Sequence, residues 1–180
     1  MAETIRQYIA RLLGNVQGLN PLKVQAATPQ RLARLVKGTR AAKLRKKPAP
    51  DKWSAAEILA HLADAEIVYS WRLRAILGAP GTPIQAYDQD AWAREGQYAK
   101  KDPHVSLAQF RAFREANLAF FKSLTPEQWK RYGMHEERGQ ETIERFLHLT
   151  AGHDLNHLAQ LEKIVSEPDT RGRRSKRRGR

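Results

Sequence analysis

Apolar residues recur at helical spacing along most of the chain, whereas the alternation typical of strands is nearly absent. Residues 3–16 carry an apolar stripe that predicts an amphipathic helix. Thr28 followed by Pro29 is typical of an N-cap and a first-turn proline, so a second helical piece is expected from there to Lys37. We expect the two pieces to form the first helix of a bundle, with a break around residues 18–27.

The clearest helix start follows Trp53. Ser54 at the N-cap and Glu57 three residues later form a capping box. Trp53 is placed to pack against Ile58 as a hydrophobic staple. This second long helix is expected to run to Leu77.

Two further long helices are predicted, each opened by a capping residue, at 106–124 and 142–167. The segment before them, 79–105, is rich in Pro, Gly, Asp and Gln and forms a long connection. It can hold a short helix at 88–95, with Trp92 packed inward. A connection of this length inside a compact domain is often functional, for example as a lid over a site.

Together these segments predict an all-α fold, a four-helix bundle with at least one long crossover loop. At 180 residues the chain is long enough for one domain with a full core. We divide it into an N-terminal helical extension at 1–27, the bundle at 28–168 and a basic flexible tail at 169–180. The tail holds no apolar residue, so it cannot bury enough surface to offset the cost of ordering.

The composition excludes several classes of site. There are no cysteines, so disulfides, thiolate metal sites and cysteine nucleophiles are ruled out. The chain shows no secretory leader and no apolar run of membrane-spanning length, so we expect a cytoplasmic protein without a membrane partner. It also lacks the G-x-S-x-G, phosphate-loop and dinucleotide-binding motifs, which leaves hydrolase triads and nucleotide sites without support.

The formal net charge of +13 is unevenly distributed, because about half of the excess lies in residues 169–180. Such a block of like charge is commonly an interaction tail that binds phosphates without reading sequence. One alternative function is therefore nucleic-acid or acidic-partner binding through this tail, with the bundle as a scaffold. The cations concerned are Arg171, Arg173, Arg174, Lys176, Arg177, Arg178 and Arg180.

Three histidines are the strongest candidates for chemistry. His153 and His157 lie four residues apart on the last helix, about 40° apart on its wheel and inside the apolar arc. His61 lies near the apolar side of the second helix, whereas His148 falls on the opposite face from His153. If the two helices are neighbours, three imidazoles can hold one divalent ion, such as Zn, Ni, Fe or Co, with a coordination position left open. The competing interpretation is that all three are ordinary core residues, each hydrogen-bonded to a neighbour.

Charged residues near these histidines suggest supporting roles. Asp64 and Asp154 are placed to accept the second ring N–H of a metal-bound histidine. Glu66 lies farther round its helix, which favours a surface charge. Arg72 shares the azimuth of His61 but lies about three turns away, so it is predicted at a pocket mouth, where it can hold an anionic substrate.

The chain also resembles a known family. Residues 52–66 (Lys-Trp-Ser-Ala-Ala-Glu-Ile-Leu-Ala-His-Leu-Ala-Asp-Ala-Glu) resemble the second-helix motif of the DinB-like (DinB/YfiT-like) superfamily. Residues 153–161 (His-Asp-Leu-Asn-His-Leu-Ala-Gln-Leu) are similar to the fourth-helix motif of that family. The likeness covers residues 28–167.

The resemblance implies an up-up-down-down four-helix bundle, often a homodimer, with a divalent metal held by His61, His153 and His157. Characterised relatives include metal-dependent transferases that attach low-molecular-weight thiols such as bacillithiol or mycothiol. Others are thiol-dependent isomerases or are assigned as metal-dependent hydrolases. The leading hypothesis is thus a metal-dependent enzyme in which water or a thiol, activated at the metal, attacks a small electrophile, giving hydrolysis or S-transfer. A third reading is a bundle that keeps the fold as a packing scaffold.

Overall fold

The computed structural model describes residues 3–168, which are mostly helical. The helices in this range are α1 (Ile5–Val16), α2 (Pro21–Lys37), α3 (Ala41–Leu44), α4 (Ala55–Gly78), α5 (Gln89–Glu95), the 3-10 helix η1 (Tyr98–Lys100), α6 (Pro103–Ser123), α7 (Pro126–Trp129) and α8 (Ile143–Ser166). The strands are β1 (Pro83–Ile84), β2 (Tyr132–His135) and β3 (Gly139–Thr142). None of these helices is both long and apolar enough to cross a membrane.

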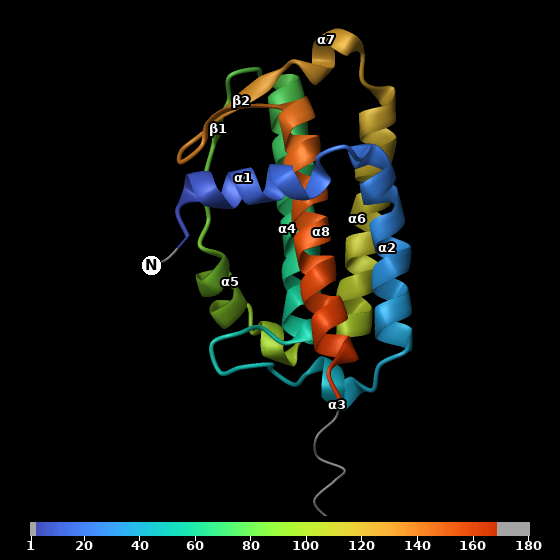
Figure 1. Cartoon of the computed structure of the whole chain (residues 1–180). Coiled ribbons are helices and arrows are strands. Elements are labelled where there is room, and N and C mark those ends of the chain that lie inside the picture. The colour runs from blue at the N-terminus through green and yellow to red at the C-terminus, as the bar shows by residue number, and fades with distance from the viewer. Residues whose placement is uncertain (1–2, 169–180) are drawn as a thin grey trace, which may run out of the picture.

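Helices α2, α4, α6 and α8 form a bundle with two core clusters (Figure 1). The end of α2, the starts of α4 and α6 and the end of α8 meet in one cluster, which includes Leu32 and Leu158. The end of α4, the end of α6 and the start of α8 meet in the other, which includes Ile76, Phe121 and Phe146. The predicted all-α four-helix bundle is confirmed.

The order of helix directions differs from the expected up-up-down-down. Helices α4 and α6 run parallel to each other and antiparallel to α2 and α8, which in Figure 1 gives down-up-up-down. The connections that follow α2 and α6 therefore join antiparallel neighbours. Residues 79–102 must instead travel back along the bundle so that α6 can start at the same end as α4. This is the long crossover that the sequence predicts, and it holds β1, α5 and η1.

A small three-stranded sheet lies at one end of the bundle. Strand β1 pairs with β2 in parallel, and β2 pairs with β3 in an antiparallel hairpin. Pairing of β1 was not foreseen because two residues are too short to show alternation. Trp92 on α5 is 40% exposed and lies against Tyr87, with ring centroids 4.5 Å apart, so the prediction that it packs inward is wrong.

Two helices begin earlier than predicted. Asn20 caps α2 and Pro21 is its first residue, so the predicted start at Thr28 lies inside the helix, as does the boundary between residues 27 and 28. Pro29 has no N–H to donate to the Gln25 carbonyl four residues earlier. That carbonyl instead accepts a hydrogen bond from Arg114 Nη1 at 3.1 Å, which helps the helix to tolerate the proline. Likewise, α6 begins at Pro103, not at residue 106.

Helix α1 is not part of a bundle helix but crosses α8 on the outside of the bundle (Figure 1). The crossing is close because residue 152 is glycine: a Cβ built there would lie 1.9 Å from the Leu12 carbonyl oxygen. Asn15 on α1 donates to the Gly152 carbonyl oxygen at 3.3 Å. Helix α1 thereby becomes a wall beside the middle of α8, where His153 and His157 lie.

Helices α4 and α8 begin where the sequence predicts. The capping box is present, with the Ser54 N–H donating to Glu57 at 2.7 Å and the Glu57 N–H donating to the Ser54 hydroxyl at 3.3 Å. Trp53 packs on the cluster that contains Ile58. Thr142 caps α8 by accepting a hydrogen bond from the Arg145 N–H. Both helices that carry the candidate histidines are thus fixed at their N-termini.

Candidate metal centre

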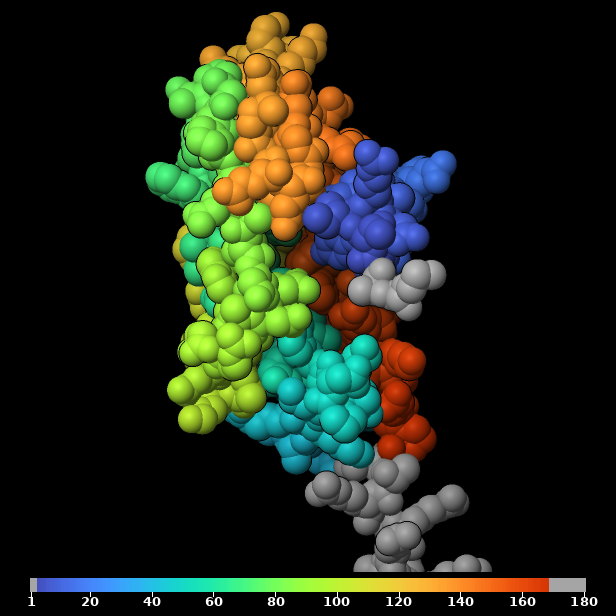
Figure 2. All heavy atoms as spheres, turned by 90° about the vertical axis from the view of Figure 1, so that its left-hand side faces the viewer, coloured from blue at the N-terminus to red at the C-terminus, as the bar shows by residue number. Residues whose placement is uncertain are grey.

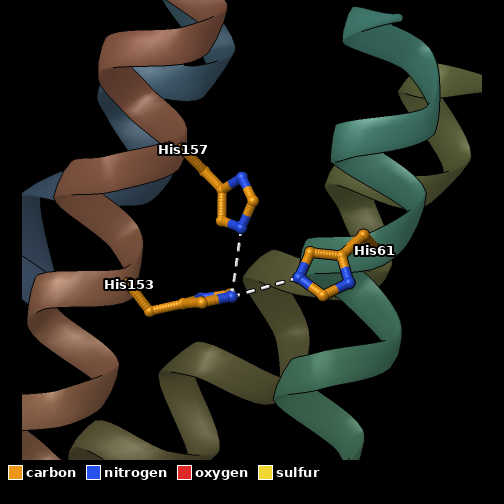
Figure 3. A group of neighbouring side chains, drawn as sticks. All are labelled: His61, His153 and His157. Carbon is orange, nitrogen blue, oxygen red and sulfur yellow. Dashed lines mark hydrogen bonds between the residues drawn. The ribbon is translucent and has the colours of Figure 1, made fainter. Parts of the chain in front are cut away.

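The three predicted histidines converge between α4 and α8 (Figure 3). Nε2 of His153 lies 3.0 Å from Nε2 of His61 and 3.1 Å from Nε2 of His157. One ring nitrogen from each residue lies within 4.8 Å of the other two. All three side chains are buried, and their convergence shows that α4 and α8 are neighbours at this point.

Neighbouring aromatic rings hold the imidazoles in place. The Trp53 ring, which precedes the cap of α4, lies 4.9 Å from the His61 ring. Tyr69, two turns further along α4, presents its ring edge-on to His153 at 6.1 Å. The capped start of α4 therefore positions both His61 and one of the rings that pack against it.

The ring protons cannot satisfy this arrangement by themselves. His157 Nδ1 lies 2.9 Å from the Gln160 Oε1, which only accepts, so Nδ1 carries the proton and Nε2 offers a lone pair. His153 Nε2 faces two other Nε2 atoms but can donate at most one proton. The Nδ1 atom of His153 is buried and has no hydrogen-bond partner in the described chain. A cation held by three Nε2 lone pairs fits this donor set better than hydrogen bonding among the imidazoles does.

Burial keeps these histidines neutral, the form that binds metal. Burial lowers the pKa of His61 to about 3, with a contribution from the nearby His157. It also lowers the pKa of His157 to about 4 and that of His153 well below its ordinary value. At neutral pH all three rings therefore present lone pairs rather than charges.

The two aspartates predicted to support the histidines contact other groups. Asp154 forms two hydrogen bonds with Arg114, whose guanidinium also binds Glu66 through two bonds of 2.8 Å. Glu66 is 3% exposed, so its interpretation as a surface charge is wrong. Arg114, on α6, was not recognised from the sequence, and its side chain is 1% exposed. This network connects α4, α6 and α8 directly beside His153.

Asp64 is likewise engaged away from the histidines. Its carboxylate lies 3.0 Å from Lys101 Nζ and also interacts with the Tyr98 hydroxyl. Burial, together with this interaction, raises the pKa of Tyr98. His148 lies apart from the cluster, as predicted, with Nδ1 3.0 Å from the Glu144 carbonyl oxygen. Neither predicted aspartate donates or accepts a hydrogen bond with a histidine of the cluster in residues 3–168.

A recess of about 380 Å³ opens onto His61 and His153. Its polar lining includes Tyr8, Tyr69, Arg72, Tyr87, His135 and Arg138. Arg72, which the sequence predicts at a pocket mouth, is a buried residue that lines this recess. His135, at the end of β2, was not foreseen, because a lone histidine in a short polar segment carries no periodic signal. A second recess, of about 660 Å³, is lined by His157, Trp53 and Gln160 and adjoins the first one, with which it shares Glu3, Tyr8 and Gln89.

A family model for the DinB superfamily matches residues 26–161, which is most of the described chain. The chain belongs to the DinB superfamily. The Bacillus subtilis protein YfiT, provisionally named a metal-dependent hydrolase, is 27% identical over 113 residues, which are 62% of this chain and 64% of YfiT. A protein of Oceanobacillus iheyensis with the same provisional description is 25% identical over 117 residues, 65% of this chain and 67% of that protein. The chain thus spans about two thirds of these DinB relatives.

The solved structure of YfiT shows the same fold. It superposes with a TM-score of 0.75 at 22% identity and covers 91% of this chain and 88% of its own. That structure is described as a four-helix bundle of unusual topology. The likeness establishes that this DinB chain shares the bundle, including the order of its long helices. The three-histidine cluster follows from the chain's own geometry.

Proposed function

We propose that this protein is a divalent-metal-dependent enzyme whose metal is held by His61, His153 and His157. The observation that carries the proposal is the convergence of three buried, neutral Nε2 atoms on one point, with a buried Nδ1 left without a partner. The provisional naming of similar proteins as metal-dependent hydrolases supports the same class of chemistry. The nature of the ion, whether Zn, Ni or Fe, is not decided by a nitrogen-only donor set.

When bound, such an ion would activate water or a low-molecular-weight thiol as a nucleophile and polarise a small electrophile. The chain's own residues position the site for this. Gln160 fixes the tautomer of His157, and the Arg114 network holds α8 at the residue that follows His153. Burial against Trp53 excludes water from one side of His61. The two adjoining recesses leave all three histidines in contact with open space.

The two recesses favour a reaction of two substrates. One is lined by His61 and His153 and the other by His157, and the two adjoin, so together they offer room for two small molecules at the cluster. This arrangement supports S-transfer from a thiol, whereas hydrolysis needs room for only one organic substrate. A thiol-transferase screen and a hydrolase screen on the metal-loaded protein separate the two reactions.

The direct test of the proposal is metal content. We expect the full chain, purified under metal-replete conditions, to hold about one ion per chain by elemental analysis. The variants His153→Ala and His157→Ala should lose it, because two imidazoles bind far more weakly than three. His148→Ala is the matched control, since it lies on the same helix outside the cluster, and should retain the ion. A wild-type protein that holds no metal under these conditions would refute the proposal.

The homodimer, the cytoplasmic location and the small-molecule partner stay predictions. The alternative of nucleic-acid binding concerns Arg171 and the other tail cations named above, which lie outside the described residues. It also stays a prediction from the sequence.

A further inference from the structure

Arg72 is an unusual charge in the described chain. Arg72 is only 6% exposed, and a buried guanidinium is ordinarily paired with a carboxylate. Among residues 3–168 its only hydrogen bond runs from Nη2 to the Gln85 carbonyl oxygen. The guanidinium also lies over the Tyr87 ring, 5.5 Å from its centroid. The Nε and Nη1 groups therefore have no acceptor in the described protein, although Arg72 lines the recess at the histidines.

Two other arginines show how the same fold treats a guanidinium with a structural role. Arg114 is fully buried and binds both Glu66 and Asp154. Arg138, which lines the same recess, binds Glu141 through two bonds of 2.8 Å. Both have carboxylates that match their charge, whereas Arg72 has none in the described range. Because the unpaired Arg72 lines the recess, its missing partner points to a negatively charged group of a bound ligand.

His135 adds a second donor in the same recess. It is 3% exposed, and its Nδ1 accepts a hydrogen bond from the Glu137 N–H at 3.2 Å. The proton of the neutral ring is therefore on Nε2. His135 thus offers an N–H group without a net charge, and it lines the same recess as Arg72.

We propose that Arg72 and His135 form a subsite for the carboxylate of a small substrate whose reacting centre lies at the three histidines. The proposal rests on the proposed function, since it names the substrate class of the same site. The planar fork of arginine matches a carboxylate, with Arg72 donating to one or both oxygens and His135 Nε2–H to one of them.

The surroundings fit a short carboxylic acid. The recess of about 380 Å³ is lined on its other sides by Ile9, Phe146 and Leu149, which suit an apolar chain. Three carboxylates of the described chain also line it, but Glu3 is exposed and paired with Arg11, Asp88 caps α5, and Glu137 is exposed. In Figure 2 the recess lies between α1, the hairpin of β2 and β3, and the crossover, with α8 visible behind them.

The test compares butyrate with butyramide, its neutral counterpart of the same shape, as probes of the metal-loaded full chain. We expect butyrate to bind at least tenfold more tightly than butyramide in calorimetric titrations at low salt. Arg72→Gln should weaken butyrate binding by roughly 10- to 100-fold, the range expected for a charge-assisted hydrogen-bonded pair, and leave butyramide unchanged. His135→Gln should give a smaller loss. Arg74→Gln, an exposed arginine of the same helix, is the control and should match the wild type.

Arg72 can also be followed without a variant, in case Arg72→Gln does not fold. Butyrate should protect Arg72 of the wild-type chain from phenylglyoxal, with the modified site identified by mass spectrometry. Equal affinity of Arg72→Gln and wild type, or no protection, overturns the subsite. Stronger binding of inorganic phosphate than of butyrate, with the same dependence on Arg72, overturns the assignment to a carboxylate.

Repeating the titrations on chelator-treated protein separates this inference from the metal site. Butyrate that binds only through the ion would lose affinity on chelation and be indifferent to Arg72→Gln, which contradicts the subsite. Binding that depends on Arg72 in a chain that never takes up metal would support the subsite and contradict the proposed function. Metal content should be equal in wild type and Arg72→Gln.

Discussion

Arg114 is the residue on which the centre of the bundle depends. Its guanidinium donates hydrogen bonds to Glu66 on α4 and Asp154 on α8, and also to the Gln25 carbonyl oxygen of α2. The Asn117 side chain donates to Glu66 at 2.9 Å and extends the network. One buried cation thereby connects four helices, and its partner Asp154 is the residue that follows His153.

Replacing Arg114 by Met should be strongly destabilising, because it leaves two carboxylates buried without their cation. We expect a loss of about 3–5 kcal/mol in the free energy of unfolding, measured by urea denaturation. Arg111→Met, on the exposed face of the same helix, should change it by less than about 0.5 kcal/mol. Adding Glu66→Gln and Asp154→Asn to Arg114→Met should recover part of the loss. A cost for Arg114→Met as small as that of Arg111→Met would show that the network contributes little.

At this scale the residues of the three-histidine cluster could be predicted and their supporting contacts could not. Periodicity places His61, His153 and His157 on core-facing arcs from local sequence alone. Glu66 is different, because its burial depends on Arg114, 48 residues away on another helix. No helical wheel of α4 contains that information, and the same holds for Asp154.

Among the elements, α1 is the one whose position the sequence did not predict. Its amphipathic pattern was recognised, but a stripe of Leu12 and Val16 shows only that one face is buried, not against what. The deciding signal is a glycine on a different helix, Gly152, which permits the close crossing. The starts of α2 and α6 differ from the predicted ones for a simpler reason. Each has two capping signals close together, and the helix begins at the earlier one, Asn20-Pro21 in α2 and Asp102-Pro103 in α6.

Gly152→Ala tests this crossing, because two effects oppose each other there. In a helix interior, alanine is more stabilising than glycine by roughly 0.5–1 kcal/mol. Its Cβ would however lie 1.9 Å from the Leu12 carbonyl oxygen, and backbone atoms cannot yield without moving α1. We expect the steric effect to dominate, so that the free energy of unfolding, measured by thermal denaturation, falls by about 1–3 kcal/mol. Amide hydrogen exchange in α1 should also become faster.

The matched control is Gly14→Ala in α1 itself. A Cβ at that position meets no atom within 4 Å, so only helix propensity acts and the protein should become slightly more stable. If Gly152→Ala were as stable as Gly14→Ala, α1 would not be held against α8 in the way described.

For the whole molecule, the buried histidines predict sensitivity to acid. The pKa of His61 is lowered to about 3 and those of His157 and His135 to about 4, whereas in the unfolded chain each returns to about 6.5. Between these values the unfolded chain binds more protons, so stability is greatest above pH 6.5 and falls as the pH drops toward 4. Each such histidine contributes up to about 1.4 kcal/mol per pH unit.

The measurement is urea denaturation of the chelator-treated chain across this range. His135→Gln should reduce the slope of the unfolding free energy against pH by the equivalent of about one proton, because it removes one titrating group that lies outside the cluster. A stability that does not change between pH 7 and pH 5 would contradict the neutral, buried state of these rings.

The source of each part of the site has an evolutionary consequence. The three histidines project from α4 and α8, two helices that the bundle core holds in register. Much of the recess around them comes from α1, the crossover and the hairpin, none of which belongs to the bundle, although Tyr69 and Arg72 of α4 also line it. Insertions and substitutions accumulate most easily in such peripheral segments. A lineage of this fold can therefore alter the outer walls of the recess while it keeps the three-histidine cluster, and such divergence need not disturb folding.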